Sequence, residues 1–450
     1  MSKPEELTLT IGAPAHGGHC IARTDEGQVV FVRHALPGET VKARITQKTS
    51  KIWRADAVEI LKSSPDRVKP AWAQAGAGGV GGAELSHVSL PAQRTWKRWV
   101  LADCLRRIGG EDIAEQVGPI PVEPMPSETG KNATGLATRT RVELTITDDG
   151  VAGMHEPRSR RVQAVRSLPL AVEAIQDLNV LEGSRWKKVY KPGMRVSVVA
   201  PAGSEPLVMI DGQGYTPATK PTGRKRIDEI VDASALGLGE LRYSVHADGF
   251  WQVHRQAPQE LVNRVVRGAL GLPLSSTEPV TVPSATDSSM DDIASSSQPA
   301  GVTHAGKDLK VLELFSGAGL FTLPLAMLGC KMTTMEGSEQ AVRDARRNLH
   351  DFPNVGLHVG RVDASAVTKL GAGVDVIILD PPRTGVVKGV MDAIAQCNPK
   401  RVVMVACDPA SLARDLKALV AQGYSVDDAC ALDMFPHTHH FETIVVASRR

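Results

Sequence analysis

The sequence contains no two cysteines in a Cys-x-x-Cys arrangement, although it has six cysteines among its 450 residues. Zinc sites and disulfide frameworks use closely spaced or regularly paired cysteines. The scattered distribution argues against both kinds of site and is typical of proteins from a reducing compartment. We therefore expect free thiols and no metal site.

Long apolar runs are missing as well. No stretch of about 18 apolar residues occurs, so we expect no transmembrane helix and no membrane partner. The first residues, MSKPEELTL, are polar and acidic and lack the basic-then-apolar layout of a signal peptide. These absences predict a cytoplasmic protein.

A strong charge of either sign is also absent, because the net charge is only +2. Basic side chains nevertheless gather in three short groups, at residues 158–161, 185–191 and 223–226. An acidic linker offsets them in the total. The distribution of charge is therefore more informative than its sum.

The first part of the chain alternates short apolar segments with turns. Val30, Val32 and Val41 follow the two-residue period of strands, and Pro37-Gly38 marks a turn between two strands. This pattern predicts a small, OB-like β-barrel over residues 1–62.

A second region, residues 63–245, has a mixed and mostly β pattern. Within it a helix is predicted over 93–110, because apolar residues recur at helical spacing and a Gly-Gly pair ends the run. We expect Trp96 and Trp99 of this helix to lie in the core.

The last region, residues 246–450, contains a segment at 273–306 that is rich in Ser, Pro and Thr. We expect this segment to be a disordered insertion. From residue 309 onward strands and helices alternate, which predicts a parallel, doubly wound sheet of the Rossmann type. The predicted fold class is therefore α/β.

Two glycines, Gly317 and Gly319, stand where the first strand of this sheet turns into a helix. Missing side chains let a ligand approach the backbone there, although a tight turn alone also explains the pair. Thr322 replaces the third glycine of the dinucleotide fingerprint, which disfavours NAD. The next strand ends in Glu336, an acid that can accept hydrogen bonds from both ribose hydroxyls.

A later strand ends in Asp380, at the edge where open α/β sheets bind ligands. A helix cap or a structural turn is the alternative role for this residue. Together the edge signals favour an adenosine cofactor without pyrophosphate, and S-adenosyl-L-methionine fits best. An aromatic residue after Asp-Pro-Pro would suggest methylation of an exocyclic amine, but Arg383 stands at that position.

Cys407 ends the following strand, and Asp408 and Pro409 are favoured at the N-cap and first position of a helix. The helix dipole is then expected to stabilise the Cys407 thiolate. The alternative is a small buried hydrophobic residue, which is the commoner role of an isolated cysteine. A thiolate suits methylation at carbon 5 of a pyrimidine, because addition of sulfur to carbon 6 makes carbon 5 nucleophilic.

That reaction also requires a base that removes the proton from carbon 5. Glu442 enters the last apolar strand and is the candidate, with an edge-strand charge as the alternative. His437, His439 and His440 are expected to be loop residues that shape the site, because their spacing matches no convincing metal set.

Four stretches resemble motifs of the bacterial RNA 5-methyluridine methyltransferases: LELFSGAGLFTLPLA, ILDPPRTG, VACDPASLARDL and LDMFPHTHHFET. The similarity is dense from 309 to 450, includes DGFWQVH at 248–254, and extends more weakly toward the N-terminus. Residues 1–62 resemble a TRAM domain, an RNA-binding β-barrel. The resemblance therefore implies a class I methyltransferase domain that is C-terminal to the RNA-binding domains.

For the reaction, the resemblance implies S-adenosyl-L-methionine-dependent methylation of uridine carbon 5, with Cys407 as nucleophile and Glu442 as base. It further implies a set of residues that line the cofactor and uridine pocket: Gln252, Phe315, Glu336, Asp363 and Asp380. The combination of a TRAM domain, a central domain and a catalytic domain is more like the 23S ribosomal RNA branch than the transfer RNA branch, which lacks the TRAM domain. We expect RNA as the partner, ribosomal rather than transfer RNA, and a monomeric protein.

One departure from the ribosomal branch concerns an iron–sulfur cluster, which those relatives often hold with four cysteines. Val80 and Ala83 occupy two of the corresponding positions here, and Ser167 occupies a third. No cysteine lies in the corresponding stretch, so we expect no cluster.

An enzyme that modifies carbon 5 has to extract the base from its stack. The three basic groups are therefore expected to bind phosphates, with Trp186 and Tyr190 as stacking faces, although a solvated surface is the alternative for each group. Three other functions stay open: transfer RNA methylation, cytosine-5 methylation, and a catalytically inactive RNA-binding protein. The sequence does not identify the modified nucleotide.

Overall fold

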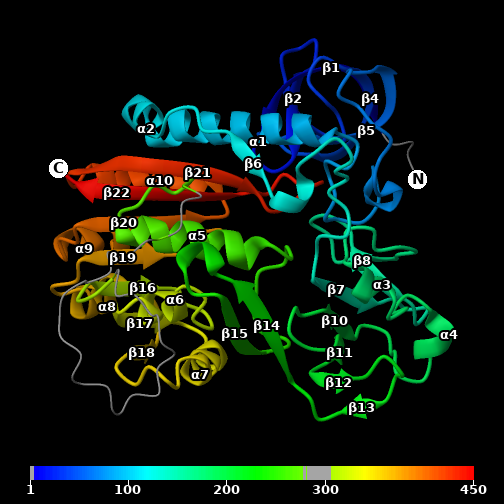
Figure 1. Cartoon of the computed structure of the whole chain (residues 1–450). Coiled ribbons are helices and arrows are strands. Elements are labelled where there is room, and N and C mark those ends of the chain that lie inside the picture. The colour runs from blue at the N-terminus through cyan, green and yellow to red at the C-terminus, as the bar shows by residue number, and fades with distance from the viewer. Residues whose placement is uncertain (1–4, 277–279, 281–305) are drawn as a thin grey trace, which may run out of the picture.

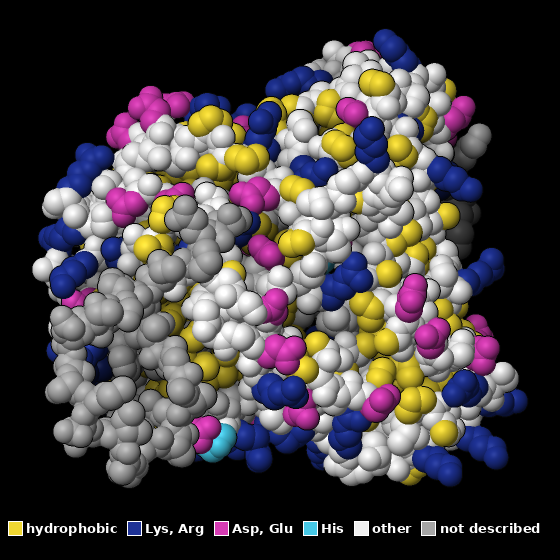
Figure 2. Space-filling model, in the orientation of Figure 1, with side chains coloured by type: hydrophobic (Ala, Val, Ile, Leu, Met, Phe, Trp, Pro, Cys, Tyr) yellow, Lys and Arg dark blue, Asp and Glu magenta, His cyan; other side chains and the backbone are white. Residues whose placement is uncertain are grey.

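The computed structural model describes residues 5–276, 280 and 306–450, and within them the strands form four sheets (Figure 1). Most of the expected insertion at 273–306 lies outside the described residues. Over the described part of the face in Figure 2, Lys and Arg side chains are interspersed with Asp and Glu.

The N-terminal barrel is closed, with strand order β1-β2-β3-β5-β4. Val30, Val32 and Val41 point into it and are fully buried, which confirms the predicted alternation. Its strands are β1 (Glu6–Ala15), β2 (His19–Arg23), β3 (Val29–Arg33), β4 (Thr40–Lys48) and β5 (Trp53–Lys62).

A helical segment follows the barrel and crosses the top of the molecule in Figure 1. Trp96 is buried as predicted, but Trp99 is 39% exposed, so the prediction for Trp99 was wrong. The buried stripe runs through Gln93, Val100 and Cys104, and Trp99 faces away from it. The elements are η1 (Ala73–Ala75), α1 (Leu90–Cys104), a π-helical turn η2 (Leu105–Gly109) and α2 (Glu111–Val117).

A second sheet, of seven strands, has the order β13-β12-β11-β10-β7-β8-β9. Its core includes Trp186 and Tyr190, which stack on each other with ring centroids 5.5 Å apart. Both rings are buried, so the prediction that they stack on RNA bases was wrong. The elements are η3 (Pro126–Glu128), β7 (Arg141–Ile146), β8 (Ala152–His155), β9 (Val162–Ala164), α3 (Glu173–Gln176), α4 (Gly183–Trp186), β10 (Arg195–Val199), β11 (Leu207–Ile210), β12 (Gln213–Tyr215) and β13 (Pro221–Thr222).

An antiparallel hairpin then leads into the last sheet. Tyr243 of the hairpin is buried, and its hydroxyl donates to the Leu320 carbonyl at 2.9 Å. The hairpin therefore packs against the turn that follows the first strand of the last sheet. Its elements, with those that follow it, are β14 (Arg226–Asp232), η4 (Ser234–Leu236), β15 (Glu240–His246) and α5 (Ala257–Leu270).

The last sheet has eight strands in the order β18-β17-β16-β19-β20-β22-β21-β6. Five neighbouring strands, β18 to β20 in this order, are parallel, and β22 runs antiparallel to β20. The elements are β16 (Lys310–Leu314), α6 (Thr322–Met327), β17 (Lys331–Glu336), α7 (Glu339–Asn348), β18 (Gly356–Val359), α8 (Ala364–Leu370), β19 (Val376–Leu379), α9 (Val390–Gln396), β20 (Arg401–Ala406), α10 (Pro409–Val420), β21 (Tyr424–Asp433) and β22 (Glu442–Arg449). The predicted doubly wound α/β sheet is confirmed.

The edge strand β6 (Val122–Pro124) of this sheet comes from far earlier in the chain and pairs with β21. The range 63–245 therefore supplies strands to more than one sheet. Among the described residues, none of the helices has the length and apolar character needed to cross a bilayer.

Candidate active site

The carboxyl ends of the parallel strands meet at one edge of the last sheet, and the turn after β16 lies there. Phe315 has a φ of 62° and Gly317 a φ of 54°, so the chain turns sharply over these residues. Among the described residues, a Cβ placed on Gly317 would meet no atom within 4 Å other than those of its chain neighbours. The hydroxyl of Ser316 is buried and has no hydrogen-bond partner in the same part of the chain. The turn therefore leaves both space and an unsatisfied polar group at this edge.

Glu336, at the end of β17, binds this turn. One carboxylate oxygen accepts from the Gly317 amide at 3.0 Å, and the other accepts from the Ser338 amide at 2.7 Å. Asp363 caps α8 by accepting from the Ala366 amide at 2.9 Å. Glu336 thus lies at a strand end, where the sequence predicts it, and Asp363 begins the helix that follows β18.

Two further acids lie behind and beside the turn. Glu313 accepts from the Thr322 hydroxyl at 2.6 Å, and burial raises the pKa of its carboxyl to about 8, with Asp380 and Glu336 adding to the shift. Burial also raises the pKa of Asp380 to about 7. The edge of the sheet therefore holds carboxyl groups that titrate near neutral pH.

Cys407 follows β20 and precedes α10, as predicted, and is partly exposed. Asp408 caps the helix by accepting from the amides of Ala410 and Ser411 at 3.1 and 2.9 Å. The expected effect of the helix on the thiol is wrong, however. Burial raises the pKa of Cys407 to about 12, and the nearby charges of Glu442 and Asp380 push it in the same direction.

The pairing of β20 with β22 brings Cys407 and Glu442 together. Ala406 lies opposite Thr443 in this antiparallel ladder, so the next positions outward are Cys407 and Glu442. Glu442 is 4% exposed, and one of its carboxylate oxygens has no hydrogen-bond partner among the residues that the structure describes. Burial raises its pKa well above the usual value; Asp380 adds to this rise and Arg383 opposes it.

In the sequence, Arg383 indicates only that methylation of an exocyclic amine is unfavoured. In the structure it is the cation that acts on both Cys407 and Glu442. Its position directly after Asp-Pro-Pro, at a strand end that carries an acid, is the sequence signal that would have identified it.

The loop between β21 and β22 carries the three histidines and leads into Glu442. Helix α1 holds this loop, because the buried Lys97 binds Asp433 at 2.5 Å and the Phe435 carbonyl at 3.0 Å. Gln93, one turn earlier, accepts from the His437 amide at 2.7 Å. His437 in turn bonds the Thr134 carbonyl at 2.8 Å.

The turn between β1 and β2 of the barrel also reaches this site. His16 lies 2.7 Å from Asp408, and this hydrogen bond raises the pKa of the His16 imidazole. A Cβ on Gly18 would lie 2.9 Å from Glu84 and 3.2 Å from His439. Nothing in the sequence pattern links residues so far apart.

Glu84, His439 and His440 form a group whose potential ligand atoms lie within 4.8 Å of one another. The Glu84 carboxylate accepts from the backbone amide of His439 at 3.0 Å and also bonds its ring. These hydrogen bonds join Glu84 to His439, and the ring of His440 lies beside that of His439, with centroids 3.8 Å apart.

Gln252 comes from the segment between β15 and α5. It is 8% exposed and lines a cavity of about 220 Å³ together with Trp251, Glu229 and Thr140. The other predicted pocket residues lie at or directly after the ends of β16, β17, β19, β20 and in the cap of α8. Trp251, next to Gln252, packs on Tyr243, whose hydroxyl bonds the Leu320 carbonyl in the turn after β16.

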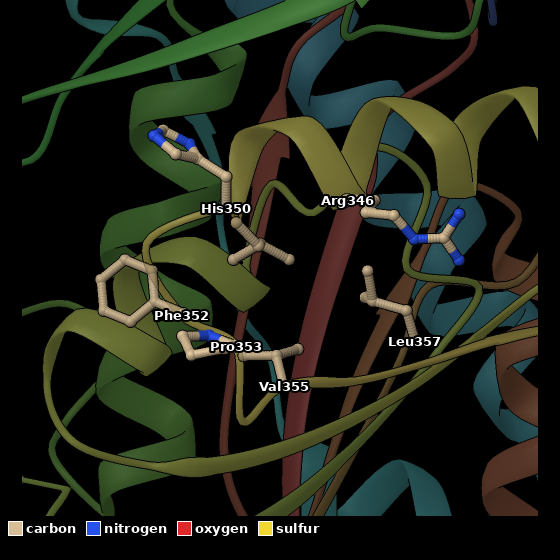
Figure 3. A pocket seen from close by; sticks show the side chains of 7 residues that line it. Arg346, His350, Phe352, Pro353, Val355 and Leu357 are labelled. Atoms are coloured by element: carbon tan, nitrogen blue, oxygen red, sulfur yellow. The ribbon is translucent and has the colours of Figure 1, made fainter.

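A second cavity, of about 320 Å³, lies between the end of α7 and β18 and is lined by Arg346, His350, Phe352 and Val355 (Figure 3). Phe352 and Val355 precede β18, so this cavity opens at the amino ends of the strands. It is therefore separate from the edge that carries Cys407.

The positions that correspond to iron–sulfur ligands in the ribosomal branch are part of the folded chain. Val80 and Ala83 are buried in the core of the seven-stranded sheet, whereas Ser167 is exposed. The absence of an iron–sulfur cluster stays a prediction.

Comparison with known proteins gives two family matches. Residues 4–58 match the TRAM domain, and residues 300–450 match tRNA (Uracil-5-)-methyltransferase. An RNA methyltransferase of Bifidobacterium longum that is described as uncharacterized is 35% identical, and the match covers 97% of this chain and 95% of that protein. A 23S rRNA (uracil(1939)-C(5))-methyltransferase RlmD of Thiobacillus denitrificans is 31% identical, with 96% and 98% covered.

Among solved structures, the tRNA (uracil-54, C5)-methyltransferase of Pyrococcus abyssi, in complex with S-adenosyl-L-homocysteine, has a TM-score of 0.66. It is 20% identical, and the match covers 98% of this chain and 100% of that one. This likeness shows a shared fold. With the relatives above, it leads to one conclusion: the chain belongs to the S-adenosylmethionine-dependent RNA uracil-5-methyltransferases that carry an N-terminal TRAM domain.

Proposed function

We propose that this enzyme methylates carbon 5 of a uridine in 23S ribosomal RNA through a covalent bond from Cys407 to carbon 6. The observation that carries the proposal is the register of β20 and β22, in which Cys407 and Glu442 occupy neighbouring positions at the ligand-binding edge. A nucleophile and a base have to reach the same ring, and this pairing supplies both.

The turn after β16 fits S-adenosylmethionine. Glu336 suits the ribose hydroxyls, the space above Gly317 suits close approach of the cofactor to the backbone, and the unsatisfied Ser316 hydroxyl suits its polar amino-acid end. When bound, the cofactor supplies an electrophilic methyl group. Phe315 and Asp363 complete this side of the proposed pocket.

In the first step, the sulfur of Cys407 forms a bond to carbon 6. The electron pair of the 5,6 double bond moves into the bond between carbons 4 and 5, and the pair of the carbon 4–oxygen 4 double bond moves onto oxygen 4. The thiol proton has to leave as this bond forms, because its pKa is raised to about 12. Asp380, whose pKa burial raises to about 7, is partly ionised at neutral pH and is the nearby acceptor. Carbon 5 then carries the nucleophilic character that methyl transfer requires.

In the last step, Glu442 removes the proton from carbon 5, the double bond re-forms, and the carbon–sulfur bond breaks. Burial raises the pKa of Glu442, which makes its carboxylate a stronger base than an exposed one. Within residues 5–276, 280 and 306–450, one oxygen of this carboxylate has no competing hydrogen bond. Arg383 favours the charged form that this step uses.

Ribosomal RNA is the proposed target because the RlmD relative of Thiobacillus denitrificans matches nearly the whole chain. Transfer RNA is the second candidate, since the Pyrococcus abyssi protein of similar fold is named for it. Mass-spectrometric mapping of 5-methyluridine in both RNAs, from cells with and without the gene, distinguishes the two. Loss of 5-methylcytidine instead would support the cytosine alternative. The monomeric state and the cytoplasmic location stay predictions.

The covalent step is tested with RNA that contains 5-fluorouridine, because fluorine at carbon 5 cannot be removed as a proton. We expect an adduct that survives denaturation with the wild-type enzyme and none with Cys407→Ala. Cys397→Ala is the matched control, since Cys397 is another partly exposed cysteine, and it should retain the adduct. Glu442→Gln should accumulate an adduct with ordinary uridine. An undiminished adduct in Cys407→Ala contradicts the proposal.

A further inference from the structure

One outward face of the TRAM barrel carries a cluster of arginines. On β3 and β5, residues two apart share a face, so Phe31 and Arg33 lie beside Arg54 and Asp56, which are their pairing partners. The residues between them, such as Val32 and Ala55, are buried inside the barrel. The arginine face is therefore the outside of the barrel.

The charge of only one barrel arginine in this cluster is offset. Arg33 makes a two-pronged ion pair with Asp56, with both distances 2.8 Å. Arg54 bonds the neutral Gln47 at 2.7 Å, and no carboxylate lies within ion-pair distance of it among the described residues. Its Nε is buried and has no hydrogen-bond partner within the described part of the chain. Arg54 thus has one unsatisfied donor and an unpaired charge there.

A third arginine comes to this face from the second sheet. Arg158 lies in the loop between β8 and β9, and its guanidinium contacts Nε2 of His19 at 3.3 Å. Its backbone has a φ of 57°, an unfavourable conformation for a residue other than glycine. Burial lowers the pKa of His19 to about 3, with Arg158, Arg33 and Arg54 adding to the effect. The neutral imidazole therefore accepts a hydrogen bond and orients the guanidinium.

The same barrel turn connects this cluster with the active site. His19 contacts Arg158, while His16, three residues earlier, contacts Asp408 at the start of the helix behind Cys407. Three residues span at most about 11 Å of chain. An anion held by these arginines therefore lies near the place where a flipped uridine would meet Cys407.

We propose that Arg54 and Arg158 together bind one phosphate of the RNA strand, close to the nucleotide that enters the active site. Guanidinium groups suit this ligand because they present paired donors that match phosphate oxygens. This phosphate site lies where the loop between β8 and β9 meets the barrel. This inference rests on the proposed function, since it takes RNA as the substrate.

The test is the salt dependence of binding to unmodified 23S ribosomal RNA, measured by filter binding with the Cys407→Ala protein as background. One lost phosphate contact on a single strand lowers the slope of log K against log salt by about 0.7, which is about fivefold in affinity at 0.1 M salt. We expect this loss in Arg54→Ala, in Arg158→Ala and, without a further decrease, in the double variant. Arg343→Ala, on the distant helix α7, is the control and should bind like the background protein (Figure 1).

Two outcomes overturn the proposal: unchanged slopes in both single variants, or a double variant that loses twice as much, which would indicate two independent surface charges. Arg158→Lys keeps the charge but not the paired donors, so we expect it to keep the slope and lose affinity. Adduct formation by the wild-type enzyme on 5-fluorouridine RNA is measured alongside. Failure of the wild-type adduct would instead refute the proposed function. Thermal unfolding of each variant verifies the fold.

Discussion

The reactivity of Cys407 in the free enzyme decides between two opposing physical effects. A helix N-terminus lowers a thiol pKa, whereas burial and the charges of Glu442 and Asp380 raise it to about 12. At pH 8 this leaves roughly 2000-fold less thiolate than a thiol with the ordinary pKa of about 8.5. Greater intrinsic nucleophilicity returns a factor of about 40, so alkylation should be roughly 50-fold slower than that of an exposed thiol.

The assay is iodoacetamide labelling of Cys407 between pH 7 and 10, quantified by peptide mass spectrometry. Because access to the site affects only the absolute rate, the pH dependence is the decisive quantity. We expect about a tenfold increase per pH unit over the whole range. A plateau at or below pH 8 would refute the reasoning and show that the helix dipole dominates.

Two variants, one directly before and one directly after β19, test whether the Asp380 charge raises the thiol pKa of Cys407. Asp380→Asn removes a charge beside the thiol, so Cys407 labelling at pH 8 should rise by up to about tenfold for each unit by which the thiol pKa falls. Asp375→Asn, at the opposite end of the same strand, is the matched control and should leave labelling unchanged. Equal effects of the two variants would rule out a local interaction.

Three further predictions concern stability. Burial raises the pKa of Glu313 to about 8, so the stability that its protonated carboxyl contributes is lost as the pH rises from about 4 through 8. In urea unfolding, Glu313→Gln should therefore be more stable than the wild type by up to about 4 kcal/mol at pH 9 and by little at pH 5. A stability difference that does not change with pH would contradict this prediction. Trp186→Ala should cost about 3–5 kcal/mol because the ring is fully buried, whereas Trp99→Ala should stay within about 0.5 kcal/mol, and equal thermal shifts would count against these placements. Lys97→Met should lower the free energy of unfolding by about 3–5 kcal/mol, because it leaves Asp433 buried without its partner, and it should lower turnover by releasing the loop before Glu442. Adding Asp433→Leu should restore stability. If Lys97→Met alone left stability unchanged, the ion pair would be unimportant.

The sequence by itself determined the local features of this protein. Periodicity placed the barrel strands and the alternating strands and helices, because burial of one face imposes a repeat of two or about 3.6 residues. Strand-end chemistry identified Glu336, Asp380 and Cys407, since side chains that follow parallel strands share one edge. The start of α10 at Asp408 and Pro409 was likewise readable from capping preferences.

Only the tertiary structure decided which distant groups meet. Burial of Trp186 and exposure of Trp99 depend on packing partners that are remote in sequence, and the thiol pKa of Cys407 depends on charges brought from other strands. The same holds for Lys97 with Asp433, His16 with Asp408, and the arginine cluster between the barrel and the second sheet. Electrostatic energies vary with distance and burial through space, and a linear pattern of residues contains neither quantity.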